Sequence, residues 1–77
     1  MYYVYMLKNE SSKEIYYGYT RDLDRRIEEH KKNGNYKLIY YEAFLSEQDA
    51  RDREISLKKY GQSRSHLKNR LKESLQL

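Results

Sequence analysis

The sequence predicts an α+β domain, in which a small three-stranded, mostly antiparallel sheet packs with helices in the order β-β-α-β-α-α. Three observations predict this class. Residues 2–8 and 14–19 are rich in tyrosine and β-branched residues and are joined by a short polar segment, which is typical of a β-hairpin. Residues 36–44 repeat that strand composition. Helical patterns with capping residues follow the second and third strand segments.

The first strand segment, residues 2–8, has no polar face. A period of two divides it into two sets, one with Tyr3, Tyr5 and Leu7 and the other with Tyr2, Val4 and Met6. We therefore expect this strand to be covered on both faces. Residues 9–13 would connect the hairpin. The second strand, residues 14–19, would then place Tyr16 on the same side of the sheet as Tyr5.

The first helix is expected to begin at Thr20 or at Arg21-Asp22 and to run to about Lys32. Leu23 and Ile27 are four residues apart and give it one apolar side. The segment Asn33-Gly34-Asn35 would end it, because glycine and asparagine tolerate the left-handed conformation found after helices.

A third strand is expected at residues 36–44, and the sequence pattern leaves its place in the sheet open. Ser46 to Asp49 has the form of a capping box and would open a second helix that runs to about Tyr60. Gly61 would end that helix, and Ser63 or Ser65 would cap a third one. The apolar stripe of this third helix consists of Leu67, Leu71 and Leu75.

Length and composition limit the protein to one domain, residues 1–77, whose core draws on ten tyrosines. There is no cysteine, which removes disulfides and the usual structural zinc sites. We expect no signal peptide, no membrane contact and a soluble, cytoplasmic protein. A chain this short leaves dimerisation or a partner protein as a source of added stability.

The net charge of +4 favours polyanionic partners. Between Lys58 and Lys72 the charged residues are all basic, and Lys58, Arg64 and Lys68 are candidate substrate contacts. This stretch fits a nucleic-acid-binding surface, and it fits a solvated basic face equally well.

The stretch from Ile15 to His30 concentrates the candidate site residues. Gly18 lies late in a strand, where glycine often marks a close approach to the backbone. Arg26 and His30 are four residues apart and project from one side of the helix. Aromatic hydroxyls, an open backbone position, an arginine and a histidine together suit an anionic substrate.

Glu54 is the second unusual feature, because it lies on the apolar stripe that Ala50 and Leu57 define. A carboxylate on such a stripe is costly unless it is paired or binds a cation. It could bind a single Mg²⁺ ion, which often takes only one or two protein carboxylates. The alternative is an ordinary ion pair with Lys58.

The other candidates also have structural alternatives. Tyr5 and Tyr16 could be plain sheet aromatics, and Arg26 could pair with Asp22. His30 could interact with the helix dipole near the end of its helix, and Gly18 could mark a bulge. Their joint presence on one hairpin–helix unit favours a functional site.

These residues resemble the motifs of the GIY-YIG nuclease family. Its two tripeptides correspond to Tyr3-Val4-Tyr5, in which Tyr3 replaces the family's glycine, and to Tyr16-Tyr17-Gly18. Residues 18–30 resemble its second motif, a Gly-x-Thr/Ser turn before a helix with an arginine and a later histidine. Residues 50–61 resemble the helix that carries its metal-binding glutamate. The resemblance covers about residues 2–65 and is closest to short stand-alone bacterial members, which are related to the incision subunit of nucleotide excision repair and to homing endonucleases.

The resemblance implies a role for each matched residue. One of Tyr5 and Tyr16 would activate or orient the attacking water, and the other would support the phosphate. Arg26 would bind the scissile phosphate, and His30 would assist. Glu54 would hold one divalent cation, Mg²⁺ or Mn²⁺. Substrate contacts are expected at Gly18, Tyr19 and Thr20, with Gly18 leaving room for the nucleic-acid backbone.

The leading interpretation is thus a metal-dependent endonuclease acting on DNA, with repair or recombination as its setting. The first alternative is a nucleic-acid-binding module on the same fold that does not cleave. The second is a protein-interaction module whose basic face meets an acidic partner. Phosphodiester hydrolysis needs a positioned nucleophile, neutralised phosphate oxygens and a stabilised leaving group, and the four residues Tyr5, Tyr16, Arg26 and Glu54 fit those needs.

Overall fold

The structure is a computed structural model that describes residues 1–77, with three strands and four helices. The elements are β1 (Tyr2–Asn9), β2 (Ile15–Thr20), α1 (Leu23–Lys32), β3 (Tyr36–Phe44), α2 (Glu47–Lys59), α3 (Gly61–Arg70) and α4 (Lys72–Gln76). The predicted α+β class and element order are confirmed, with one more helix than expected. None of the helices has the length and apolar character needed to cross a bilayer.

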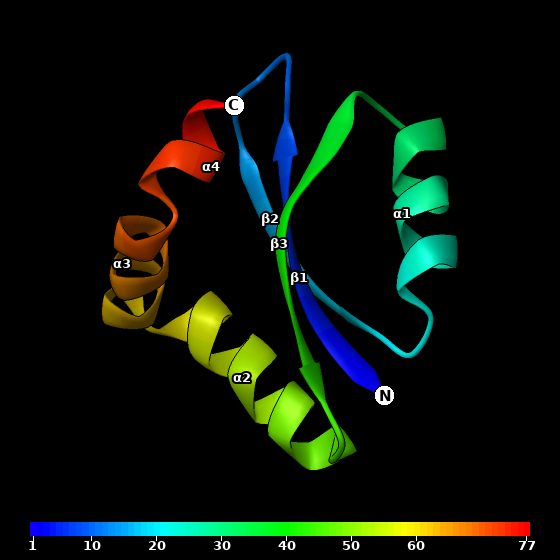
Figure 1. Ribbon diagram of the computed structural model, residues 1–77, viewed down its shortest axis with the longest axis vertical. Helices are drawn as coiled ribbons and strands as arrows, with labels where there is room; N and C mark the ends of the chain where they lie inside the picture. Colours follow the sequence, from blue (N-terminus) through cyan, green and yellow to red (C-terminus); the bar gives the residue numbers. More distant parts are fainter.

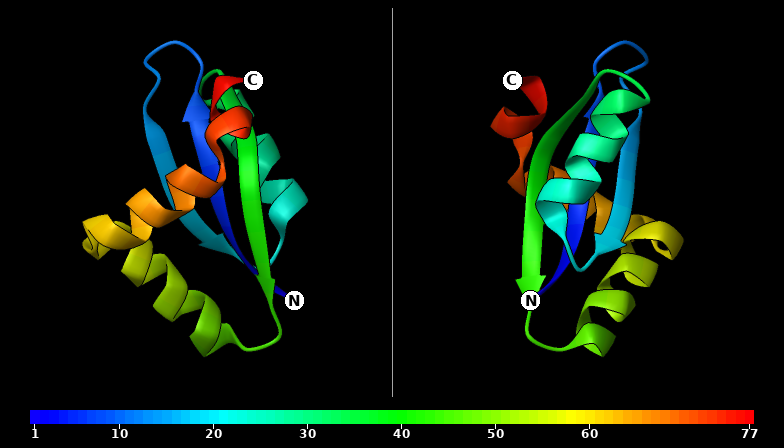
Figure 2. Two further views of the ribbon diagram at one scale, coloured as in Figure 1. Left: turned by 60° about the vertical axis from the view of Figure 1, so that its left-hand side comes forward. Right: turned by 90° about the vertical axis from the view of Figure 1, so that its right-hand side faces the viewer.

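The sheet has the order β2-β1-β3, and both pairings are antiparallel. The sequence left the place of the third strand open, and the structure puts it on the far side of β1 from β2. β1 is the central strand, and all of Val4–Leu7 is buried, which confirms that this strand is covered on both faces. Figure 1 and Figure 2 show α1 on one face of the sheet and α2, α3 and α4 on the other.

The hydrophobic core lies on the face that α2 and α3 cover. Its fully buried members come from β1, α2 and α3 and are Val4, Met6, Ala50, Leu57 and Leu67. The predicted stripe of the last helix holds in part: Leu67 is buried, and Leu71 and Leu75 pack against the core while only partly buried. At Leu71 the helix breaks, and this break separates α3 from α4.

A β-bulge interrupts the pairing of β1 with β3. Met6 lies opposite Tyr40 and Leu7 lies opposite Leu38, so Ile39 has no partner on β1. A bulge shifts the alternation of side chains by one residue. Tyr36 and Leu38 therefore share the face of Tyr5, as Tyr41 does on the other side of the bulge.

Two helix starts have side-chain caps. Asp22 accepts a hydrogen bond from the backbone N–H of Arg25 and begins α1, and Ser46 accepts one from Asp49 and begins α2. The second confirms the N-terminal half of the predicted capping box.

The predicted junction between the second and third helices was wrong. Gly61 does not end α2 but is the first residue of α3, and neither Ser63 nor Ser65 caps that helix. The extended backbone of Tyr60 separates the two helices. The Arg64 guanidinium donates to the carbonyls of Leu57 and Lys58, both at 2.9 Å, so it satisfies helix-end groups for which a glycine was expected.

Candidate active site

Tyr5 and Gly18 lie directly opposite each other on β1 and β2. A Cβ atom at position 18 would collide with Cζ and the hydroxyl of Tyr5, so the phenol ring occupies the space above the glycine. The close approach predicted at Gly18 therefore exists, but the chain's own tyrosine makes it. Tyr5 thus fills the space directly above Gly18, and contact of Gly18 with the backbone of a nucleic acid stays a prediction.

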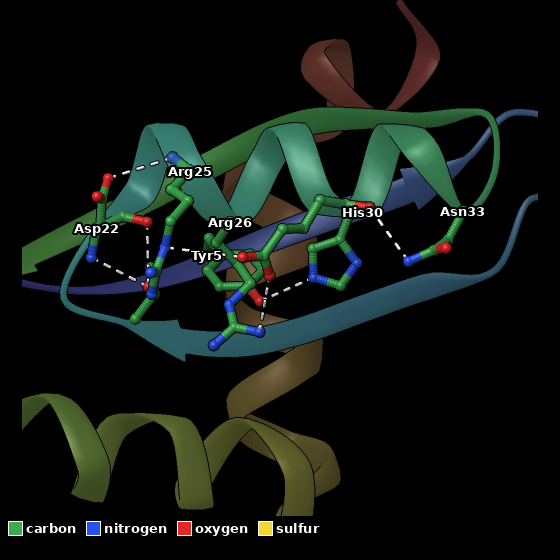
Figure 3. Close-up of polar contacts among 8 residues, drawn as sticks. Tyr5, Asp22, Arg25, Arg26, His30 and Asn33 are labelled. Carbon is green, nitrogen blue, oxygen red and sulfur yellow. Dashed lines mark hydrogen bonds and ion pairs between the residues drawn. The ribbon is translucent and has the colours of Figure 1, made fainter.

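The Tyr5 hydroxyl forms a hydrogen bond with Nε2 of His30, at 3.0 Å. The two rings meet edge to face, with centroids 5.7 Å apart. Figure 3 shows Tyr5 pointing from the sheet toward Arg26 and His30 on α1. In the Nδ1–H tautomer of His30 the phenol donates this bond, and in the Nε2–H tautomer the imidazole donates it.

Tyr16 and Tyr36 extend this contact into a tyrosine–histidine cluster, which consists of Tyr5, Tyr16, His30 and Tyr36. Tyr36 packs edge to face on His30 at 5.6 Å and on Tyr16 at 5.4 Å. The strand register confirms that Tyr5 and Tyr16 share one side of the sheet. Tyr16 remains exposed, and its pKa is raised, with the neighbouring Tyr36 as the main cause.

Charges from two helices act on the buried Tyr5 hydroxyl. Burial raises the pKa of Tyr5 above its ordinary value of 10.0, Arg26 on α1 lowers it, and Glu54 on α2 and Glu29 raise it. The phenol is therefore protonated at neutral pH. Arg26 and Glu54 come from helices on opposite faces of the sheet, and the charges of both act on the Tyr5 hydroxyl.

Arg26 forms an ion pair with Glu29 at 3.4 Å, not with Asp22, which serves as the helix cap. Its side chain is 42% exposed, and Glu29 also pairs with Arg25 at 3.7 Å. An exposed pair of this kind contributes only about 0.2–1 kcal/mol. The guanidinium can thus leave Glu29 for a phosphate at little cost, and its planar fork suits two phosphate oxygens.

Glu54 forms the predicted ion pair with Lys58, at 3.1 Å, while its own side chain is 22% exposed. No cluster of three or more histidine, cysteine, aspartate or glutamate side chains forms a ready-made metal site. A lone carboxylate fits Mg²⁺ or Mn²⁺ nevertheless, because phosphate oxygens and water complete the coordination of such hard cations. A cation bound there would compete with the Lys58 ammonium for the same oxygens.

The predicted substrate-binding residues do not lie together at the tyrosine–histidine cluster. Tyr19 donates to Glu47 at 2.6 Å on the opposite face of the sheet, and the buried Thr20 hydroxyl bonds to the backbone of Asp22. Lys58 is paired with Glu54, and Arg64 holds the end of α2. Lys68 is exposed on α3, where contact with a substrate stays a prediction.

Two residues of this site were missed in the sequence. Tyr36 joins His30 to Tyr16, and Glu29 positions Arg26. Glu29 had a signal, since it lies three residues after Arg26 on a helix. Tyr36 had none, because its face depends on the bulge at Ile39.

Matches to known proteins cover most of the chain. Residues 1–72 match the protein family described as GIY-YIG catalytic domain. The UPF0213 protein CPE1444 of Clostridium perfringens is 35% identical over 68 residues, which cover 77% of this chain and 72% of that protein. The solution structure of the UPF0213 protein BH0048 from Bacillus halodurans is 30% identical, with a TM-score of 0.63, and the match covers 94% of this chain and 86% of that one.

Proposed function

Because this chain belongs to the GIY-YIG family, whose domain it matches over residues 1–72, we propose that it is a metal-dependent endonuclease that hydrolyses phosphodiester bonds. The observation that carries the proposal is the Tyr5 hydroxyl, which is bonded to His30 and lies within the influence of Arg26 and Glu54. A plain sheet aromatic requires neither partner. DNA as the substrate, and a role in repair or recombination, rest on the family alone.

In this proposal Tyr5 activates the attacking water. A protonated phenol is a poor base, and burial keeps Tyr5 protonated. The bond to His30 supplies what is missing: Nε2 accepts the phenol proton while the phenol oxygen accepts a proton from the water. The water oxygen then bonds to phosphorus, and the bond from phosphorus to the leaving oxygen breaks. This arrangement favours Tyr5 over Tyr16 as the base.

The other residues act on the phosphate. Arg26 exchanges Glu29 for two non-bridging oxygens and stabilises the charge that develops on them. The exposed Tyr16 hydroxyl hydrogen-bonds the same phosphate. Glu54 would hold the divalent cation, and a bound cation would stabilise the negative charge on the leaving oxygen.

The test is cleavage of labelled duplex, flap, branched and single-stranded DNA, with an RNA of the same sequence, in Mg²⁺ or Mn²⁺. Wild type is compared with Glu54→Gln and with Asp52→Asn, a control at an exposed carboxylate on the same helix. We expect cutting by wild type and Asp52→Asn and none by Glu54→Gln. Full activity of Glu54→Gln would refute the metal assignment. Salt-sensitive binding without cleavage of any substrate would favour a non-catalytic binding module.

A further inference from the structure

A pocket of about 290 Å³ opens where β2 leads into α1, beside the candidate active site. Its lining consists of Tyr3, Arg21, Asp22, Leu23, Asp24 and Tyr41. None of these residues takes part in the chemistry proposed above. Tyr3 and Tyr5 share one face of β1 and are two residues apart, which is about 7 Å along a strand.

Two tyrosines form the aromatic wall of this pocket. Tyr3 and Tyr41 meet edge to face with centroids 6.0 Å apart, and Tyr41 is 51% exposed. An exposed tyrosine held in place by a second ring offers a rigid surface on which a flat ligand can stack. Stacking on aromatic side chains is a general way of holding nucleic-acid bases.

Arg21 is a cation without an ion-pair partner at the same pocket. Its guanidinium lies over the ring of Tyr2, 5.5 Å from the centroid, and it is not among the ion pairs of the molecule. Arg51 stacks on Tyr19 in a similar way but is paired with Glu47. Tyr2 lies on the other face of β1 from Tyr3, and the Arg21 charge also acts on the Glu47 carboxylate, whose pKa it helps to lower. A phosphate would therefore meet the Arg21 N–H groups at the rim of the pocket, in competition with Glu47.

Two carboxylates restrict what can enter the pocket. Asp22 is occupied in part by its hydrogen bond to the N–H of Arg25, while Asp24 makes no side-chain hydrogen bond or ion pair. Carboxylates repel a phosphate and accept hydrogen bonds from amino groups. A nucleotide would thus keep its phosphate at Arg21 and direct a base amino group toward Asp24.

We infer that this pocket binds an unpaired nucleotide of the nucleic-acid strand next to the scissile phosphate, and that it prefers a base with an amino group. Cytosine presents its N4 amino group to a carboxylate, whereas thymine presents the O4 acceptor in that place. The base must be unpaired, since only a base that has left the stack of the duplex can lay its face on the ring of Tyr41. The assignment rests on the proposed function, because that function supplies the strand.

The experiment measures the affinity of the protein for three labelled DNA duplexes by fluorescence anisotropy, at one salt concentration and with EDTA to prevent cleavage. One duplex is fully paired, one has a single unpaired cytidine and one has a single unpaired thymidine. The variants are Tyr41→Ala, Arg21→Gln and Asp24→Asn, and the control is Tyr60→Ala, at a tyrosine that is 59% exposed and outside the pocket.

We expect wild type to bind the duplex with unpaired cytidine about tenfold more tightly than the paired one. Tyr41→Ala and Arg21→Gln should remove this preference, Tyr60→Ala should keep it, and Asp24→Asn should remove only the preference for cytidine over thymidine. Equal binding of all three duplexes by wild type would overturn the inference, and so would an unchanged preference in Tyr41→Ala. Amide spectra of each variant verify its fold.

Two further results separate this inference from the proposed function. Cleavage of DNA without any preference for the unpaired nucleotide would remove the pocket assignment and leave the enzyme. A preference without cleavage would keep the pocket and remove the enzyme. If free cytidine monophosphate competes as well as the duplex with unpaired cytidine, the ligand is a free nucleotide and the assignment to a strand is wrong.

Discussion

The two faces of the sheet are built on different principles. On one face α2 and α3 bury Ala50, Leu57 and Leu67 against β1, and the contacts are apolar. On the other face α1 has no buried residue of its own, and it covers Tyr5 and Leu7 with half-buried side chains, among them His30, which bonds to Tyr5. The comparison suggests that the first face provides most of the stability and that the second provides the phenol, the imidazole and the guanidinium of the proposed chemistry, to which α2 would add only the Glu54 carboxylate. A change on one face should leave the property of the other largely intact.

The largest effect is expected from Arg26→Gln, because this residue is proposed to stabilise charge on the phosphate. Removal of such an arginine costs about 10³-fold or more in rate. The control is Arg25→Gln, whose side chain precedes Arg26 on α1 and pairs with the same Glu29. Cleavage rates at saturating metal are compared, along with urea unfolding. Equal losses in the two variants would mean that only the net charge of α1 matters.

The next largest effect belongs to the apolar face. Leu57→Ala removes a fully buried side chain and should lower the free energy of unfolding by about 2–5 kcal/mol. Ile55→Ala on the same helix is the control, because Ile55 is exposed and should matter much less. Urea unfolding measures both. Under native conditions, the remaining folded Leu57→Ala protein should cleave at the wild-type rate, and a selective loss of activity would contradict the division between faces.

Gly18→Ala should affect stability and cleavage together, and so tests the division between the two faces. The added Cβ collides with the ring of Tyr5 and forces it to move, so overpacking should destabilise the protein by about 1–3 kcal/mol. The same movement should break the Tyr5–His30 bond and reduce cleavage. The measurements are thermal unfolding and the His30 ring signals in NMR spectra. Gly61→Ala is the control, since a Cβ there meets only the end of Arg64 at 3.7 Å.

Tyr17→Phe should have a smaller effect and the opposite sign. The Tyr17 hydroxyl is buried beside the core without a hydrogen-bond partner. Its removal should raise the free energy of unfolding by about 1 kcal/mol, since a buried polar group without a partner is costly. Denaturant midpoints measure this. Destabilisation in Tyr17→Phe would show that the hydroxyl has a partner in solution.

The smallest effect at ordinary pH is expected from the raised tyrosine pKa values. Burial raises the pKa of Tyr5, Tyr17 and Tyr40 above 10.0. The folded state therefore binds these protons more tightly than the unfolded state does. Their contribution to stability is complete below pH 10 and is lost as the pH rises through the folded-state pKa values. These tyrosines should leave the denaturant midpoint of unfolding unchanged with pH up to about pH 9, and the midpoint should fall at higher pH.

Much of the fold could be predicted from local patterns. The lack of a polar face in residues 2–8 located a strand covered on both faces, and the spacing of Leu23 and Ile27 located α1. The α2–α3 junction could not be predicted, because Arg64 takes the role expected of a glycine, and a side chain six residues further along leaves no local pattern. The third strand could not be placed for a similar reason: its pairing with β1 is a long-range contact.

In the candidate site, too, the local relationships could be predicted and the long-range ones could not. Tyr5, Arg26 and His30 were predicted from spacing within one hairpin–helix unit, and the structure brings them together. Tyr36 was missed, because counting by two from Tyr41 places it on the wrong face. Only the unpaired Ile39 restores it to the face of His30. A bulge depends on the pairing of two strands and is not visible in either strand alone.

Because side chains alternate along Val4–Leu7, the same run of residues determines which side chains reach each face of the sheet. Each residue of this buried run belongs to one face, and its neighbour belongs to the other. A single inserted or deleted residue would exchange the Tyr5 hydroxyl for an aliphatic side chain and drive a phenol into the core. An insertion or deletion within β1 should therefore abolish catalysis and destabilise the fold at once, because the same alternation of side chains serves both. Tolerated insertions should be confined to the loops, such as the polar connection between β1 and β2.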